Sequence, residues 1–438
     1  MKQKRKTEST TPEGPPTIFT AGEILPNGKI IELVSSPPTG DLRLLTLDGK
    51  TPHISEEIDL WDRVYRPIQL HCSVRQAIRF PSGAAEFGSV CALAAETCEL
   101  LCLWLGLPTP TAWSLTIWIL TTWVFDALPN PPTLVVAGNI HQVIALFRLL
   151  QCMVRRGLTL ADISRAALDS VLMSLHPTIL LNRDDLPKRM GALLAASNHT
   201  GFHIPGRADT LLNIAGSRAI YAGIQLTTDS WTENTLRICL PPANSVPPPI
   251  STDTLHGVEV QLLPKLLMYR LRYSYDVQLC RLASPQVGSC SSELSHNLLA
   301  CVLQEKDLGE NLLPILESHE EDGRAQQARD PNYAIVEASW APLHQGGMIR
   351  VSELTEKVNA LLQSRGEFLE YSPEEIGWKL KNLGIGRRRG QKNNEVRFSR
   401  ELSRHLHRLA RSYGLNLPRH ENCPDCASPE VVAAEEGM

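Results

Sequence analysis

Apolar and polar residues alternate with a period of two in the first part of the chain, as they do in half-buried β-strands. The segment GEILPNGKIIELVSS begins at Gly22, and DLRLLTLDGKTPHI begins at Asp41. The turn signals PNGK and LDGK separate the alternating runs, and such Asn-Gly and Asp-Gly pairs are typical of β-hairpins. We therefore predict a small β module over residues 21–67. A polar, proline-bearing tail over residues 1–20 is predicted to be disordered.

Residues 68–245 carry long apolar helical patterns with two short strand-like runs between them, TLVVAG at 133–138 and TILLN at 178–182. Strands that alternate with helices indicate a parallel sheet flanked by helices. We therefore predict an α/β domain here and a helical extension over residues 246–303. The charged segment 304–335 is predicted to be a surface linker.

The run AWSLTIWILTTWVFDAL, residues 112–128, is apolar enough to suggest a membrane span. However, its uncharged core ends at Asp126. The tryptophans at positions 113, 118 and 123 recur every five residues, so they are spread around a helix, whereas the aromatic anchors of a membrane helix lie at its two ends. The prediction is a buried core helix and no membrane association.

A compact helical pattern returns in residues 336–416. Ser372-Pro373-Glu374-Glu375 is a capping box with proline at the first helical position, and the helix that it opens stops at Gly384. A basic turn, GRRRGQKNNEVRFS, and a last helix, RELSRHLHRLARSYGL, follow. Residues 417–438 are predicted to be a disordered tail.

The overall charge indicates no partner, because 43 basic and 47 acidic residues among 438 leave a net charge of −4. Any indication of a charged binding partner must therefore come from a local cluster of charged residues. The chain has eleven cysteines, an odd number, and its N-terminus MKQKRKTEST has no apolar segment behind it. Both features favour a reducing cytoplasm over secretion.

The stretch LVVAGNIHQVIALFRLL, residues 134–150, has the rhythm of a strand, a loop opening on glycine and a helix, as in a phosphate-binding loop. Such a loop follows Gly-x-x-x-x-Gly-Lys-Ser/Thr, where lysine meets the phosphates and the hydroxyl holds Mg²⁺. Counting from Gly138, the last three positions are Val143, Ile144 and Ala145. The chemical groups of a nucleotide site are missing, so we predict a degenerate loop and no cofactor.

Downstream, HPTILLNRDDLPKRMGALLAASNHTG has the layout of a metal-binding acidic strand followed by a sensor element. Asn182 and Arg183 occupy the slots where an ATPase would carry Asp-Glu, and Asp184 and Asp185 follow. Asn182 cannot supply a carboxylate to Mg²⁺. Arg237 falls about three positions late for an arginine that reaches a neighbour's γ-phosphate.

With these segments the chain resembles the P-loop ATPase domain of helicase- and primase-associated proteins found on plasmids, phages and integrated elements of bacteria. The resemblance spans about residues 80–240 and is carried by ILTTWVFDALPNPPTLVVAG, PTILLNRDD and AIYAGIQL. It implies a P-loop-type parallel sheet, ATP-driven work on DNA, and a helicase or replication partner. Because the catalytic positions depart from the family pattern, the combination predicts a pseudoenzyme scaffold with no catalytic residue.

The C-terminal segment 348–415 resembles a winged helix in the order of its parts. From Gly386 to Tyr413 it has nine Arg or Lys against two Glu. Such local positive charge favours nucleic-acid binding through counterion release, and a helix offering Lys and Asn can read bases in a major groove. The predicted nucleic-acid-binding residues are Lys379, Lys381, Asn382, Arg387, Arg388, Arg389, Lys392, Arg397, Arg400, Arg404 and Arg408. Docking to a protein and a plain solvated face remain alternatives.

The tail LPRHENCPDCASPE places His420, Cys423 and Cys426 at metal-ligand spacing. A structural zinc site needs four ligands, and only His405 and His407 are near in sequence. We therefore predict no metal and keep these three residues as weak candidates. His199 and His203 flank a glycine, but no partnered nucleophile accompanies them.

The predicted fold is thus α/β: a P-loop-type parallel sheet flanked by helices, a small N-terminal β module and a C-terminal winged helix. The predicted function is a cytoplasmic, DNA-binding, mobile-element-type protein. Two alternatives remain open. One is an ATPase or helicase accessory enzyme whose site is completed by a partner, and the other is a non-catalytic protein-interaction scaffold.

Overall fold

The computed structural model describes residues 15–37, 39–60, 63–164, 174–196, 203–205, 211–224, 234–242, 249–283, 292–302, 304–345, 348–385, 395–415, 417–420 and 423–426. The chain divides into two compact units, Met1–His319 and Glu320–Met438. Residues 1–14, 421–422 and 427–438 of the two tails predicted to be disordered lie outside the described residues. The prediction is wrong for Thr17–Thr20, which pair with another strand of the β module.

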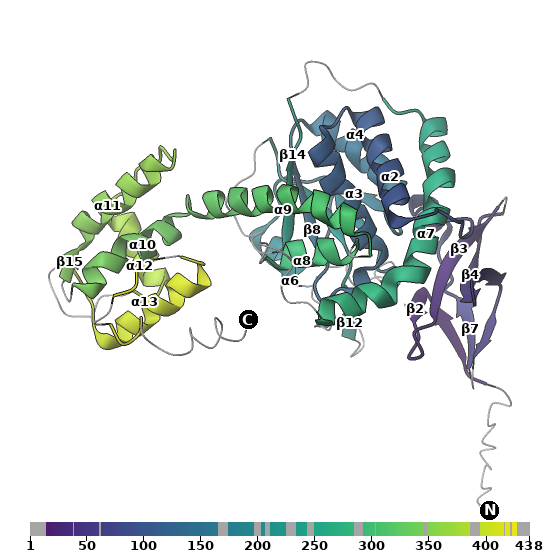
Figure 1. Cartoon of the computed structure of the whole chain (residues 1–438), viewed down its shortest axis with the longest axis horizontal. Helices are drawn as coiled ribbons and strands as arrows, with labels where there is room; N and C mark the ends of the chain where they lie inside the picture. Colours follow the sequence, from purple (N-terminus) through teal and green to yellow (C-terminus); the bar gives the residue numbers. More distant parts are fainter. Residues whose placement is uncertain are drawn as a thin grey trace, which may run out of the picture. The chain divides into compact units, whose positions relative to one another are not determined.

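The N-terminal part of the first unit is a β module, as the alternating pattern predicts (Figure 1). Its strands are β1 (Thr17–Thr20), β2 (Gly22–Ile24), β3 (Ile30–Ser36), β4 (Asp41–Asp48), β5 (Thr51–Ser55), β6 (Ile58–Leu60) and β7 (Arg63–Pro67). An antiparallel sheet has the order β2-β3-β4-β5, and a second sheet has the order β1-β7-β6. The two predicted turns fall between β2 and β3 and between β4 and β5, where Gly28 and Gly49 adopt positive φ angles of 79° and 60°.

Three helices follow the β module: α1 (Cys72–Ala77), α2 (Val90–Leu105) and α3 (Thr109–Trp123). Helix α3 contains most of the apolar run 112–128, and its last ten residues are all buried. Trp118 donates a hydrogen bond from Nε1 to the Pro132 carbonyl at 3.0 Å, and Trp123 donates one to the Met153 carbonyl at 2.9 Å. Within the described part of the chain, none of the helices combines the length and hydropathy that crossing a bilayer requires.

The centre of the first unit is a five-stranded parallel sheet, so the predicted α/β class is confirmed. Its strands are β8 (Thr133–Ala137), β9 (Leu158–Leu160), β10 (Ile179–Leu181), β13 (Arg218–Tyr221) and β14 (Thr235–Cys239), in the order β14-β8-β13-β10-β9. The short helix η1 (Phe125–Ala127) precedes β8, and between the strands lie α4 (Ile140–Gln151), α6 (Lys188–Ala196) and the hairpin of β11 (His203–Pro205) and β12 (Leu211–Asn213). The pattern of the sequence predicts β8 and β10; the other three strands of the sheet were not predicted.

Helices α7 (Thr252–Ala283) and α8 (Glu293–Ala300) form the predicted helical extension, and α7 packs against α2 and α3. The segment predicted to be a surface linker, 304–335, is instead mostly the helix α9 (Lys306–Gln327). It is helical because Leu308, Leu312 and Leu316 recur every four residues and are buried against the core of the first unit.

A cluster of five charged side chains joins the β module to the α/β part of the first unit. We call Glu32, Asp126, Arg155, Arg156 and Arg270 the Glu32 cluster; its members come from β3, η1, the turn after α4, and α7. Glu32 Oε2 accepts hydrogen bonds from Arg155 Nη2 and Arg270 Nε, both at 2.8 Å, and Oε1 pairs with Arg156. Arg270 also binds both oxygens of Asp126 at 2.7 Å.

The second unit is a small helical domain with a two-stranded sheet (Figure 1). Its elements are α10 (Pro331–His344), β15 (Met348–Arg350), α11 (Val351–Ser364), α12 (Pro373–Asn382), β16 (Glu395–Arg397) and α13 (Arg400–Ser412). The predicted capping box is present, because Ser372 Oγ accepts from the Glu375 N–H while Glu375 Oε2 accepts from the Ser372 N–H. The core includes Ile335, Leu354, Val358, Ile376 and Leu406.

Candidate functional site

The carboxyl ends of the five parallel strands meet at one edge of the sheet, which is where open parallel sheets bind ligands. Gly138 follows strand β8, which lies between β14 and β13, at this edge and has a φ angle of +148°. A Cβ at this position would lie 2.9 Å from Cβ of Leu240, so glycine is required by close packing. The Gly138 N–H donates to the Gly223 carbonyl at 2.9 Å. The glycine that suggested a phosphate loop therefore has a packing role.

The loop after β8 is only two residues long, since α4 begins at Ile140. Asn139 caps the helix, and its side chain accepts from the His141 N–H at 2.9 Å. Val143, Ile144 and Ala145 consequently lie on α4 itself, with Val143 fully buried and Ile144 partly exposed. The edge thus offers a short capped turn in place of a long loop that wraps phosphates.

Charged residues that follow β10 form ion pairs with one another and with a residue that follows β9. Arg183 forms an ion pair with Asp162, which follows β9, and a second with Asp185 at 2.7 Å. Hydrogen bonds from Arg183 lower the pKa of both exposed carboxyl groups. Asp184 is exposed beside Gly223, and the backbone N–H of Asn182 donates to the Leu160 carbonyl at 2.8 Å. Of the described carboxylates that follow β9 and β10, Asp162 and Asp185 are therefore already matched by a guanidinium.

Arg237 lies within β14, in register with Val135 of β8. It is half-buried, which lowers the pKa of its guanidinium, and its backbone N–H donates to His319 Nε2 at 3.1 Å. His203 is exposed at the start of β11. His199 lies outside the described residues.

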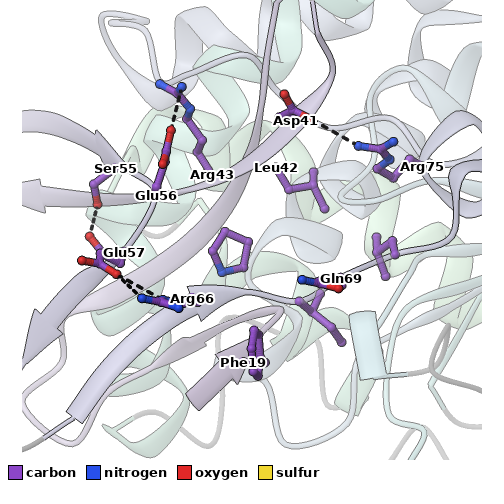
Figure 2. Close-up of a pocket in the computed structure, with 13 residues that line it drawn as sticks. Phe19, Asp41, Leu42, Arg43, Ser55, Glu56, Glu57, Arg66, Gln69 and Arg75 are labelled. Atoms are coloured by element: carbon purple, nitrogen blue, oxygen red, sulfur yellow. Dashed lines mark hydrogen bonds and ion pairs between the residues drawn. The ribbon is translucent and has the colours of Figure 1, made fainter. Parts of the chain in front are cut away.

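A surface pocket of about 870 Å³ lies on the β module, which the sequence did not suggest as a site (Figure 2). Its charged lining consists of three acids and three arginines that pair with one another: Arg43 with Glu56 at 3.2 Å, Arg66 with Glu57 at 2.8 Å, and Arg75 with Asp41 at 3.5 Å. Every charged side chain of the lining has an opposite partner, so the pocket presents no excess charge to a ligand.

In the second unit, α12 turns a polar and aromatic face to solvent. Trp378, Lys381 and Asn382 are exposed and are spaced three and four residues apart, so they share one face of the helix. The Lys381 Nζ lies 5.2 Å from the centre of the Trp378 ring. Lys379 is half-buried, with its Nζ 5.1 Å from the centre of the Tyr371 ring. Sequence reasoning missed Trp378 because an isolated tryptophan is usually assigned to the core.

The basic residues of α13 differ in their surroundings. Arg400 and Arg408 are exposed, as is Arg397 at the end of β16. Arg404 lies 3.6 Å from Oδ1 of Asp425, and Arg411 donates to the Asp425 carbonyl at 3.5 Å. Of the other predicted nucleic-acid-binding residues, Arg387, Arg388, Arg389 and Lys392 lie outside the described residues.

Two of the candidate metal ligands in the tail lie next to histidines from two helices. Cys423 and Cys426 lie next to His344 of α10 and His407 of α13. His420 is not in this group, and its ring stacks on that of His344 with centroids 4.1 Å apart. His405 is bonded elsewhere, to the Leu383 carbonyl at 2.6 Å. Sequence reasoning missed His344, since it precedes Cys426 by 82 residues.

No family model and no curated protein sequence matches the chain. Among solved structures, the A form apo structure of the NrS-1 C-terminal region is similar with a TM-score of 0.37 and 11% identity. Two further apo structures of that region have TM-scores of 0.35 and 0.34 with 10% and 11% identity. Each alignment covers 84% of this chain and 96% of the other.

Proposed function

We propose that this chain is a DNA-binding protein in which the α/β unit is a scaffold without ATP hydrolysis and the second unit binds DNA as a winged helix. The observation that carries the proposal is the outward face of α12, where Trp378, Lys381 and Asn382 are exposed on a helix fixed by a capping box. A helix of this kind, packed on α10 and α11, is suited to enter a major groove.

The charge distribution supports the same proposal. The whole chain has a net charge of −4, yet Gly386–Tyr413 has nine basic residues and two acidic residues. Arg397, Arg400 and Arg408 are exposed in this segment. Binding through phosphate contacts releases counterions, so a local excess of this size is sufficient even in an acidic chain.

The residues at the edge of the sheet support the proposed absence of hydrolysis. Ile144 cannot neutralise a phosphate, Ala145 cannot ligate Mg²⁺, and Asn182 has no carboxylate. The two-residue turn before α4 removes the backbone that would surround the phosphates as well. We infer that the residues at this edge of the sheet contribute to packing and do not catalyse a reaction.

Fluorescence anisotropy with a labelled DNA duplex across a salt series tests this function on the full chain. Lys381, Arg400 and Arg408 are changed together to alanine, and the matched control changes Lys50, Lys306 and Lys357, which are exposed elsewhere. We expect affinity to fall steeply with salt. In the first variant the slope should weaken by up to about 0.9 for each phosphate that is no longer neutralised. Equal effects of the two variants, or no binding at low salt, would overturn the proposal.

A protein partner is the second candidate for the same unit. Phe368 and Leu369, between α11 and α12, are 89% and 68% exposed, and Trp378 is 67% exposed. Large apolar side chains at a surface favour protein interfaces. The test compares DNA binding of the Trp378→Ala variant with that of the wild type. If the wild type binds DNA and the variant binds it equally well, these side chains would be assigned to a protein interface.

A further inference from the structure

Four ligand-type side chains from three separate segments of the second unit converge on one point. His344 is the last residue of α10, His407 lies in α13, and Cys423 and Cys426 belong to the tail after it. Their candidate ligand atoms all lie within 4.8 Å of one another. Cys426 Sγ is 3.2 Å from Nε2 of both His344 and His407, and Cys423 Sγ is 3.6 Å from His407 Nε2.

These separations suit four ligands around one ion. Zinc binds sulfur at about 2.3 Å and imidazole nitrogen at about 2.0–2.1 Å in a tetrahedron. The edges of such a tetrahedron are about 1.6 times the bond length, which gives roughly 3.3–3.8 Å between ligand atoms. The three distances between sulfur and nitrogen lie at or near this range. Only small movements of the side chains are needed to close the site.

Both imidazoles are already oriented for metal binding. The Nδ1 of His344 lies 2.9 Å from the Trp340 carbonyl, and the Nδ1 of His407 lies 2.8 Å from the Ser403 carbonyl. A carbonyl can only accept, so each Nδ1 carries the proton and donates it. Each Nε2 then presents its lone pair to the thiols. Histidine ligands of metals commonly make this second hydrogen bond, which fixes the tautomer and the ring.

The tail holds its two cysteines in a compact turn against the helices. The Cys426 N–H donates to the Cys423 carbonyl at 3.1 Å, and the Cys423 N–H donates to the His420 carbonyl at 3.0 Å. Trp340 of α10 donates from Nε1 to the Pro418 carbonyl at 3.0 Å. The Cys-x-x-Cys spacing of residues 423–426 is therefore presented towards α10 and α13 by backbone contacts.

We propose that His344, His407, Cys423 and Cys426 bind a structural zinc ion that fastens the tail to α10 and α13. Two thiolates and two imidazoles are the ligands that zinc prefers, whereas Mg²⁺ and Ca²⁺ require oxygen. Four protein ligands leave no open coordination position, so the site holds structure and performs no chemistry on a substrate. This site shares helix α13 with the proposed DNA-binding face but uses none of the residues assigned to DNA.

The first experiment measures zinc by inductively coupled plasma mass spectrometry in the full chain, purified with a reductant and without added chelator. About one zinc per chain is expected. The variants His344→Ala and Cys426→Ser should fall below about one tenth of that content. His420→Ala, beside the site, and Cys91→Ser, exposed elsewhere, are the matched controls and should keep their zinc.

Cobalt substitution adds a readout that folding alone does not give. The wild-type chain loaded with Co²⁺ should show the visible bands of a tetrahedral site and a thiolate charge-transfer band in the near ultraviolet. His344→Cys should retain the metal and strengthen that band, because a third thiolate replaces an imidazole.

Three results would overturn the proposal: a folded, reduced chain that binds neither Zn²⁺ nor Co²⁺, a His344→Ala chain that keeps its zinc, or a His420→Ala chain that loses it. These results are independent of DNA affinity, so failure of the zinc site is distinguishable from failure of the proposed function.

Discussion

The two units use charge in opposite ways. In the first unit the distinctive charges are buried and paired with one another, as in the Glu32 cluster, where the side chains of Glu32 and Arg155 are 2% and 3% exposed. In the second unit Lys381, Arg400 and Arg408 are exposed on the surface. Buried pairs hold elements in one arrangement, whereas exposed cations are available to a partner.

The same contrast separates the two places where the sequence suggested function. At the carboxyl edge of the parallel sheet, close packing against Leu240 requires a glycine at position 138. Arg183 forms ion pairs with Asp162 and Asp185. At α12, the polar side chains face outward. Residues at motif-like spacing can therefore contact a partner only where their side chains are left available. Substitutions in both units can test this distinction.

The largest effect is expected from Glu32→Gln. It leaves three buried guanidinium groups with Asp126 as the one remaining acid of the Glu32 cluster, and breaking such a buried arrangement costs about 3–5 kcal/mol. Hydrogen exchange on peptides from β3 and α7, measured by mass spectrometry, would report the reduced stability. The control Glu56→Gln removes an exposed pair with Arg43 in the same β module and should change little. Similar protection in both variants would contradict a structural role of buried charge.

The Glu32 cluster should also make the first unit sensitive to acid. Burial raises the pKa of the Glu32 carboxyl, but the guanidinium groups of Arg155, Arg156 and Arg270 outweigh it and hold the pKa well below its ordinary value of 4.5. A lowered pKa stabilises the folded state above 4.5, and this contribution is lost as pH falls below that value. Thermal unfolding from pH 7 downwards should therefore show the difference between wild type and Glu32→Gln shrinking below about pH 4.5. A constant difference would exclude the linkage.

A smaller effect is expected at the surface of the second unit. Asp425 lies beside Arg404 and accepts from Ser403 at 3.1 Å, so Asp425→Asn should release Arg404 while keeping the shape of the tail. Because Arg404 is exposed and the pair is long at 3.6 Å, it is weak, and we expect DNA affinity to increase about two- to threefold in the anisotropy assay. The isosteric change Asp322→Asn in α9 is the control for net charge. An affinity that stays the same or falls would contradict a contact between Arg404 and DNA.

No effect is expected from restoring the missing groups of the phosphate loop. Ile144→Lys with Ala145→Ser supplies the lysine and the hydroxyl, but both residues lie on α4 behind a two-residue turn. ATP turnover measured by phosphate release should remain at the level of the wild type. Turnover that appears in the double variant, and disappears again in Ile144→Met with Ala145→Ser, would show that chemistry alone had been missing.

Features determined by neighbours in sequence were predictable from the sequence alone. The hairpin turns at Gly28 and Gly49, the capping box of Ser372 and the buried helix around Trp118 follow from local propensity and hydrophobic period. The α/β class followed from the order of such elements. Strands β9, β13 and β14 could not be predicted from the sequence. Short buried strands show no alternation of apolar and polar residues, and they are defined by pairing with strands distant in sequence.

Only the tertiary structure decided which charged and ligand-type residues meet. Glu32 and Arg270 are 238 residues apart, and His344 and Cys426 are 82 apart, so neither pair leaves a local signal. The buried face of α9 likewise depends on the core against which Leu308, Leu312 and Leu316 pack. The physical reason is that turns and caps are stabilised within a few residues, whereas burial and ligand geometry arise only when packing closes long loops.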